Sequence, residues 1–347
     1  MHRLPYRGSR PAFCASLAFV LSCGVTHPAR ADAVEDFYKG KTISLAIAHS
    51  AGGGYDLYGR LLARFLRKHI PGQPIIVPQQ MTGAGGLRVV NYLYSAAPKD
   101  GTVIGTFSRS LPTLPLFTPN SNFDGTKLTW LGSMANDTSV CVTGAQSAIK
   151  TWQDMLTKPV IMGGQASGSD SDIYARLYRN VFGAKIKLVS GYPGTTDITL
   201  AMDRGEVDGI CGLSWGTIKI AHAQRIRDRS INMLVQAGLA KDPELPDLPL
   251  ATDLTDDPEK KKVLYLHMAP QGMGRPFAAP PGIPADRKAA LINGFNATMK
   301  DPEFLETAAK EGMDISPITG GEIDKLLGQL YAMPPDIIAK AAKAIAD

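Results

Sequence analysis

A glycine-rich turn, residues 48–56, holds the residues best suited to bind a ligand. It joins a predicted strand (41–48) to a predicted helix (55–69). Glycines let the backbone approach a ligand closely, and a helix start offers unpaired N–H groups at the positive end of its dipole. The turn is therefore suited to an anion and needs no cationic side chain. Asp56 either caps the helix or accepts a ligand hydroxyl. The contacts expected here are Ser50, Gly52, Gly53, Gly54, Tyr55 and Asp56.

Further glycine turns follow predicted strands at residues 82–86, 163–170 and 191–196. In open α/β sheets, ligands bind beyond the carboxyl ends of the strands. Several helix N-termini that face one cleft indicate a small polyanion such as a dicarboxylate. The contacts expected from these turns are Gly85, Ser167, Gly168, Ser169, Asp170, Tyr192, Gly194, Thr195 and Asp197.

Three polar side chains stand at or after strand ends. Arg109 follows a predicted strand (102–107) together with Ser108, and its guanidinium either clamps a ligand carboxylate or pairs with a protein acid. Ser214 lies in GLSWG, which fits the GxSxG pattern of serine esterases, with Asp253 and His267 downstream in the required order. A binding protein also places a hydroxyl at a strand end, so both interpretations of Ser214 stay open.

Other motifs argue against cofactor chemistry. The GKT of residues 40–42 lacks the first glycine of a phosphate loop, since Glu35 stands there, and it precedes its strand instead of following it. The histidines form no HExxH motif, and the cysteines lack zinc-finger spacing. We therefore expect no cofactor and no metal. Of the two interpretations of Ser214 we favour the binding role, so we expect no catalytic residue.

The first 31 residues are typical of a secretory signal peptide: a basic start, an apolar run and an A-x-A site at Ala29–Ala31. Lipidation at Cys23 is the less favoured alternative. The segment holds four of the 37 basic residues and no acid, so the net charge of +5 falls to +1 without it. This near-neutral balance gives no reason to expect nucleic-acid binding.

The remaining chain alternates predicted strands and helices in two α/β units. Strands at 140–143, 160–163, 186–189, 207–211 and 231–236 form the second unit, and helices fill most of residues 286–346. We expect those last helices to pack on the first unit, which gives domain 1 residues 32–131 and 272–347 and domain 2 residues 132–271. Cys141 and Cys211 lie in two predicted strands, and an oxidising compartment favours a disulfide between them.

Short motifs throughout the mature chain resemble those of the Bug (TctC-like) family, the periplasmic receptors of tripartite tricarboxylate transporters. The first loop matches at Gly52, Gly53, Asp56 and Arg60. It departs from the family at Ala48, His49 and Tyr55. The other matches are Gly83, Ala84, Gly85 and Gly86; Pro98, Asp100, Gly101 and Thr102; Tyr192 and Gly194; Gly205, Val207 and Asp208; and Ala279, Pro280, Gly282 and Pro284.

The resemblance implies an α/β, two-domain periplasmic-binding-protein (Venus flytrap) fold with a hinge and an interdomain ligand cleft. It implies a small organic carboxylate, held mostly by main-chain groups and waters, that the receptor delivers to a large and a small membrane subunit. We expect a monomer, the default for a receptor that must open and close. His49, Tyr55, Arg109 and Trp215 favour an aromatic or longer carboxylate. The alternatives are a secreted esterase that uses Ser214 and a receptor that presents its ligand to a signalling system.

Overall fold

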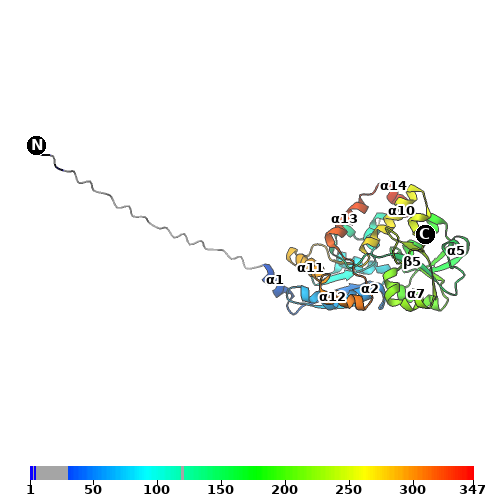
Figure 1. Cartoon of the computed structure of the whole chain (residues 1–347), viewed down its shortest axis with the longest axis horizontal. Helices are drawn as coiled ribbons and strands as arrows, with labels where there is room; N and C mark the ends of the chain where they lie inside the picture. Colours follow the sequence, from blue (N-terminus) through cyan, green and yellow to red (C-terminus); the bar gives the residue numbers. More distant parts are fainter. Residues whose placement is uncertain (3, 5–29, 119–120) are drawn as a thin grey trace.

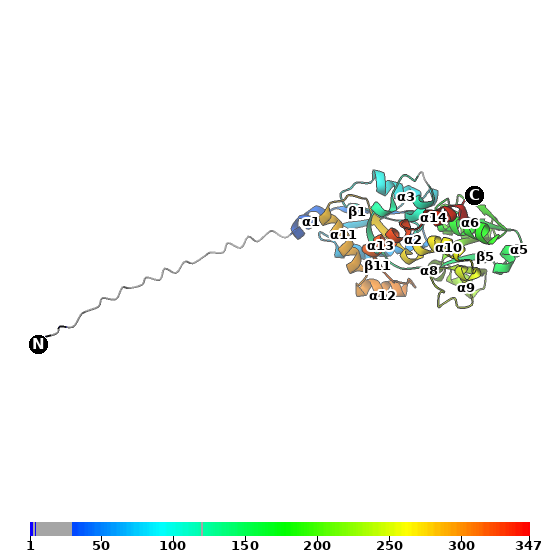
Figure 2. The same ribbon diagram turned by 90° about the horizontal axis from the view of Figure 1, so that it is seen from above.

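The computed structural model describes residues 1–2, 4, 30–118 and 121–347, and it contains two β-sheets with helices on both faces of each (Figures 1 and 2). The predicted signal segment, 1–31, lies almost entirely outside the described residues. An unpredicted helix, α1 (Arg30–Tyr38), packs Val34 and Tyr38 into the core of the first sheet. Within the described parts of the chain, no helix has the length and apolarity to span a bilayer.

The first sheet has six strands in the order β11-β4-β10-β3-β1-β2. The parallel strands β1 (Thr42–Ile47), β2 (Ile75–Gln80) and β3 (Val103–Thr106) form one part, and β10 (Pro276–Ala279) runs antiparallel to β3 and β4 (Thr129–Ser133). The short β11 (Ile318–Thr319) pairs antiparallel with β4.

Both faces of the first sheet are buried, which explains the continuous apolar run of β1. Ile43 and Leu45 point to one face and join α2 (Gly54–Leu66) and α11 (Ala285–Thr298) in a single core. Ala46 points to the other face, toward α3 (Leu87–Asn91) and α13 (Gly320–Tyr331). This alternation is the period of two that a strand imposes on its side chains.

The second sheet has five strands in the order β7-β6-β8-β5-β9. β6 (Val160–Gly163) runs parallel to β7 (Ile186–Val189) and β8 (Gly209–Ser214). β5 (Ser139–Gly144) runs antiparallel to β8 and to β9 (Ile231–Ala237). The helices of this unit are α5 (Trp152–Thr157), α6 (Asp170–Phe182), α7 (Thr195–Asp203), α8 (Trp215–Ala221), α9 (Ala223–Arg227) and α10 (Pro258–Met268).

A disulfide between Cys141 and Cys211 joins β5 to its neighbour β8. The predicted pairing is therefore confirmed. Both sulfurs are buried in the core that α6 and α10 share with the sheet.

The chain passes from one sheet to the other through residues 134–138, after β4, and returns through the 3-10 helix η7 (Ala269–Met273) before β10. The predicted domain boundaries fall within β4 and η7 and stay a prediction. Of the C-terminal helices, α11, α12 (Pro302–Lys310) and α13 pack on the first sheet's unit, as expected. The last helix, α14 (Pro335–Ala344), differs: it packs on α10 and α6, because Ile337 and Ala341 fill the second unit's core (Figures 1 and 2). It also contacts the short helix α4 (Leu114–Phe117), which follows β3 and packs against the same core.

Candidate ligand-binding site between the two sheets

Loops from both sheets meet around a small enclosed cavity. The loops after β1 and β3 and the residue before β10 come from the first sheet's unit. The loops after β6 and β7, the end of β8 and the start of α8 come from the second. The cavity has a volume of about 30 Å³, which is about the space that one water molecule takes up in the liquid. Its lining residues are His49, Gly53, Gly54, Tyr55, Ser108, Arg109, Gln165, Asp170, Thr195, Gly212, Leu213, Ser214, Thr217 and Arg275.

The cavity is small because the two units are closed on each other. Ser50 Oγ donates a hydrogen bond of 2.6 Å to Asp197 Oδ2, from the loop after β1 to the first turn of α7. A Cβ atom on Gly194 would lie 2.7 Å from the same Oγ. A Cβ on Gly54 would lie 2.2 Å from Thr217 Oγ1 of α8. These glycines therefore let the two units approach each other closely.

A cluster of buried charged residues lies against the cavity. Arg109 and Arg275 belong to the first unit, Asp170 begins α6 of the second, and Asp137 lies in the connection between the sheets. Arg109 Nη1 and Arg275 Nη2 lie 2.8 and 2.9 Å from Asp137 Oδ2. Arg109 Nε lies 2.8 Å from Asp170 Oδ2. We call these residues the charge cluster, and its formal charges sum to zero.

Neighbouring charges set the protonation of the cluster. Burial alone would raise the pKa of Asp137, but Arg275 and Arg109 outweigh it and hold the pKa below its usual range. Burial opposes the charge of Arg109, yet Asp170 and Asp137 raise its pKa overall. The Arg109 guanidinium therefore pairs with protein acids, which is one of the two roles that the sequence predicts for it.

An aromatic wall lies beside the cluster. The rings of His49 and Tyr55 stack with centroids 4.6 Å apart, and the Arg275 guanidinium lies 5.2 Å from the Tyr55 ring. Burial, with Arg275 nearby, lowers the pKa of His49 to about 4, so its imidazole is neutral. Within the described chain, His49 Nδ1 and Gln165 Nε2 are buried with no hydrogen-bond partner. Both residues line the cavity, so these atoms are available to a ligand.

Several predicted contact residues instead build the helix starts. Asp56 accepts hydrogen bonds from Gly52 N (2.9 Å) and Arg60 Nε (2.8 Å) and also from Gln80 Nε2. Its carboxylate is therefore hydrogen-bonded to donors of its own unit. Ser169 caps α6 by accepting from Asp172 N.

The predicted residues divide into three sets by position. Gly53, Gly54, Tyr55, Ser108, Arg109, Asp170, Thr195 and Ser214 line the cavity. Ser50, Gly85, Gly168, Gly194 and Asp197 lie where the units touch. Gly52, Asp56, Ser167, Ser169 and Tyr192 lie outside the cavity lining, with Ser167 exposed.

Sequence reasoning missed Asp137, Gln165 and Arg275 as site residues, and it connected His49 with the ligand only through the family resemblance. Asp137 and Arg275 lie in connecting segments, and nothing in their local sequence marks them. His49 and Gln165 lie in two of the glycine turns, and this position could have marked them as site residues.

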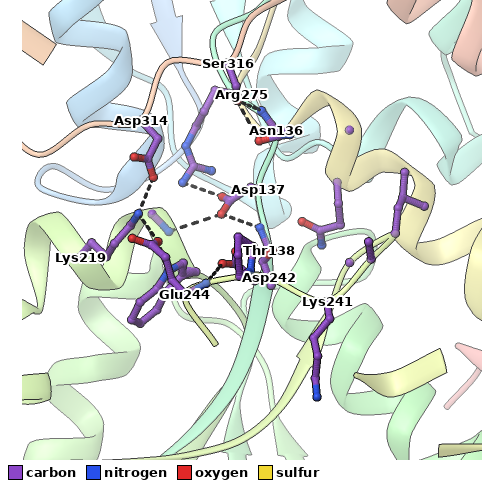
Figure 3. A pocket seen from close by; sticks show the side chains of 18 of the residues that line it. Asn136, Asp137, Thr138, Lys219, Lys241, Asp242, Glu244, Arg275, Asp314 and Ser316 are labelled. Atoms are coloured by element: carbon purple, nitrogen blue, oxygen red, sulfur yellow. Dashed lines mark hydrogen bonds and ion pairs between the residues drawn. The ribbon is translucent and has the colours of Figure 1, made fainter. Parts of the chain in front are cut away.

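A second, larger cavity of about 630 Å³ lies on the hinge side of the charge cluster (Figure 3). Lys219 of α8 bridges the units there, with Nζ 2.6 Å from both Asp314 Oδ2 and Glu244 Oε2. Arg275 lines both cavities, and Figure 3 shows its guanidinium beside the Asp137 carboxylate.

The esterase arrangement is not assembled around Ser214. The Ser214 hydroxyl accepts from Thr217 N, which caps α8, and from Arg275 Nη2. His267 Nε2 lies 3.0 Å from Ala341 O, and its ring packs on Phe117. The histidine that this hypothesis needs is therefore engaged elsewhere in the fold.

Comparison with known proteins supports the same fold. A sequence model of the family described as "Tripartite tricarboxylate transporter family receptor" matches residues 59–341. A Cupriavidus necator relative, "UPF0065 protein in gbd 5'region", is 25% identical over 295 residues, 83% of each chain.

Two solved structures share the arrangement of both sheets. The periplasmic binding protein BugD has a TM-score of 0.72 at 18% identity and covers 88% of this chain and 98% of its own. An R. palustris protein with adipate has a TM-score of 0.68 at 17% identity, with coverage of 87% and 97%. The predicted periplasmic-binding-protein fold is therefore confirmed. The chain belongs to the tripartite tricarboxylate transporter receptor family, whose members are periplasmic binding proteins.

Proposed function

We propose that this protein captures a small organic carboxylate between its two units in the periplasm and delivers it to a large and a small membrane subunit. It works as a monomer and performs no catalysis. The ligand enters an open cleft, and closure of the two units traps it. The R. palustris neighbour with adipate supports the ligand class.

The observation that carries this proposal is the pair of helix starts left without a side-chain cap at the cavity. The N-cap residues of α2 and α7 are Gly53 and Gly194, and neither provides a capping side chain. By contrast, α6 and α8 are capped by Ser169 and Ser214. Because uncapped N–H groups at a positive helix end favour an anion, α2 and α7 can hold a carboxylate from opposite sides of the cleft.

A thermal-shift and calorimetry screen of the purified protein tests the proposal. The panel contains mono-, di-, tri- and aromatic carboxylates, with uncharged sugars and amines as comparison compounds. A ligand that binds only the folded state at about 100 times its Kd adds about 2.7 kcal/mol of stability. We expect a selective carboxylate to raise the melting temperature. Binding of sugars or amines alone would refute the ligand class.

A glycine pair then tests whether closure over α2 is needed. Gly54→Ala places a methyl group against Thr217 Oγ1 and should block closure. Gly328→Ala on α13 is the matched control, because a Cβ there meets open space. Gly54→Ala should weaken carboxylate binding about tenfold or more, for which a loss of about 1.4 kcal/mol suffices. Equal affinity in both variants would place the ligand outside the closed cleft.

A further inference from the structure

Asp170 makes the contacts that a bound carboxylate would make. It is the first residue of α6 in the second unit, and its side chain is only 10% exposed. Asp170 Oδ1 accepts from Ser108 Oγ (3.2 Å) and from Ser110 Oγ, and Oδ2 faces Arg109 Nε at 2.8 Å. All three partners lie on the loop after β3, in the first unit. Two hydroxyls and a guanidinium are a suitable set of partners for a ligand carboxylate.

The charge cluster leaves no excess positive charge for a second ligand carboxylate. Arg109 faces Asp137 and Asp170, and Arg275 faces Asp137. Among the described residues, these arginines and Asp170 are the charged side chains that line the cavity. A ligand anion near Arg109 would also lie beside Asp170, and buried like charges at such distances repel strongly.

Two neutral polar atoms at the cavity remain open to a ligand, and so does Arg275 Nε, whereas Arg109 Nε lies 2.8 Å from Asp170 Oδ2. His49 Nδ1 and Gln165 Nε2 are buried, line the cavity and have no partner within the described chain. They come from opposite units, one before α2 and the other before α6. A hydroxyl, carbonyl or amide group of a ligand would satisfy them, since a buried polar atom left unpaired is costly.

We propose that Asp170 occupies the anion position at Arg109 in place of a ligand carboxylate, and that this receptor therefore selects monocarboxylates with a neutral polar group over dicarboxylates. The ligand's single carboxylate lies at the uncapped starts of α2 and α7, and its neutral end lies near His49 and Gln165. This inference rests on the proposed function and departs from the dicarboxylate that the glycine turns predict.

The first experiment asks whether the Asp170 position is an anion site. Asp170→Gly removes the whole side chain and leaves Arg109 with space for acetate, which has the same carbon and oxygen atoms as that side chain. Melting temperatures are measured with increasing sodium acetate, against sodium chloride at equal ionic strength. The matched control is Asp172→Asn, which alters an acid in the same first turn that faces Ser169 and Ser190 instead.

We expect acetate to raise the melting temperature of Asp170→Gly by at least about twice the shift of the wild type and of the control. Equal shifts in all three proteins would overturn the assignment of an anion position. If Asp170→Gly does not fold without acetate, recovery of folded protein by refolding with acetate, but not with chloride, gives the same answer.

The second experiment tests selectivity by calorimetry. The probes are pairs of equal chain length, four to eight carbons, such as 6-hydroxyhexanoate and adipate, which differ only in the terminal group. The wild type should bind the hydroxy acid of a pair about tenfold or more tightly than the diacid. The isosteric variant Asp170→Asn should bring the two affinities within about threefold, and Asp172→Asn should leave the wild-type ratio unchanged.

The outcomes separate this inference from the proposed function. If the wild type binds the diacid as tightly as the hydroxy acid, or more tightly, the inference is overturned. The proposed function as a carboxylate receptor is then unaffected. A ratio that Asp170→Asn does not change would overturn it as well. If the wild type binds no carboxylate at all, the proposed function fails, and with it the selectivity. The acetate experiment then still decides whether Asp170 occupies an anion position.

Discussion

Replacing Ser50 with alanine should weaken ligand binding about tenfold without unfolding either unit. The Ser50 hydroxyl donates to Asp197 Oδ2 across the cleft at 2.6 Å. The bond joins different units, so opening the cleft breaks it. A ligand that binds by closing the cleft therefore depends on it.

The size of the effect follows from the chemistry of the bond. A hydrogen bond to a charged group contributes about 1.5–3 kcal/mol net. Both residues are half-buried, so we expect the lower end of that range. A loss of about 1.4 kcal/mol corresponds to a factor of ten in affinity. The alanine keeps the Cβ atom that packs against Gly194, so the loss is that of the hydroxyl alone.

Calorimetry with the best ligand of the screen measures the affinity, and small-angle X-ray scattering of the ligand-free protein measures opening. Ser44→Ala is the matched control, because Ser44 Oγ donates to Gln79 Oε1 within the first sheet. We expect the Ser50 variant to be more open and to bind less tightly than the control. Affinities within about twofold of each other would refute the role of this bond in closure.

Other predictions concern stability. Asp137→Ala leaves two buried guanidiniums without their shared acid and should cost about 3–5 kcal/mol in urea unfolding; a cost near zero would contradict the charge cluster. Burial lowers the pKa of His49 and of His267 to about 4, so the unfolded chain, with a histidine pKa of about 6.5, binds more protons than the folded one between these values. The free energy of unfolding therefore carries the full contribution of both histidines above about pH 6.5, and it falls by about 3 kcal/mol for each histidine as the pH falls to about 4. Urea melts at several pH values should show that His267→Gln loses less stability at low pH than the wild type. Reducing Cys141–Cys211, which closes a 70-residue separation, should lower stability by about 4 kcal/mol in melts with and without reductant.

Most of the fold could be predicted from the sequence because local signals agree with it. The second unit's predicted strands at 160–163 and 186–189 coincide with β6 and β7, since short apolar runs between turns leave little choice. The position of α14 could not be predicted in this way. Its apolar stripe shows that it packs against something, but the partner is chosen by the shape of the whole molecule.

The candidate site was only partly predictable for a similar reason. Glycine turns mark the backbone positions near the cavity, and Gly53 and Gly54 do line it. The sequence does not show which acid faces which arginine. Arg109, Asp137 and Asp170 are separated along the chain and meet only in the folded protein. Because the formal charges of the charge cluster sum to zero, the expected ligand changes from a polyanion to a compound with a single carboxylate.

The charge cluster also bears on how closure is driven. Asp137 lies in the connection between the sheets, so its pair with Arg109 need not break when the cleft opens. Asp170 belongs to the other unit, so it approaches Arg109 only on closure. Its carboxylate then loses water, and its contacts with Ser108, Ser110 and the guanidinium offset part of this desolvation cost. Contacts between protein residues thus supply a share of the free energy of closure. The ligand supplies the rest through the uncapped starts of α2 and α7, and only that share can distinguish one carboxylate from another.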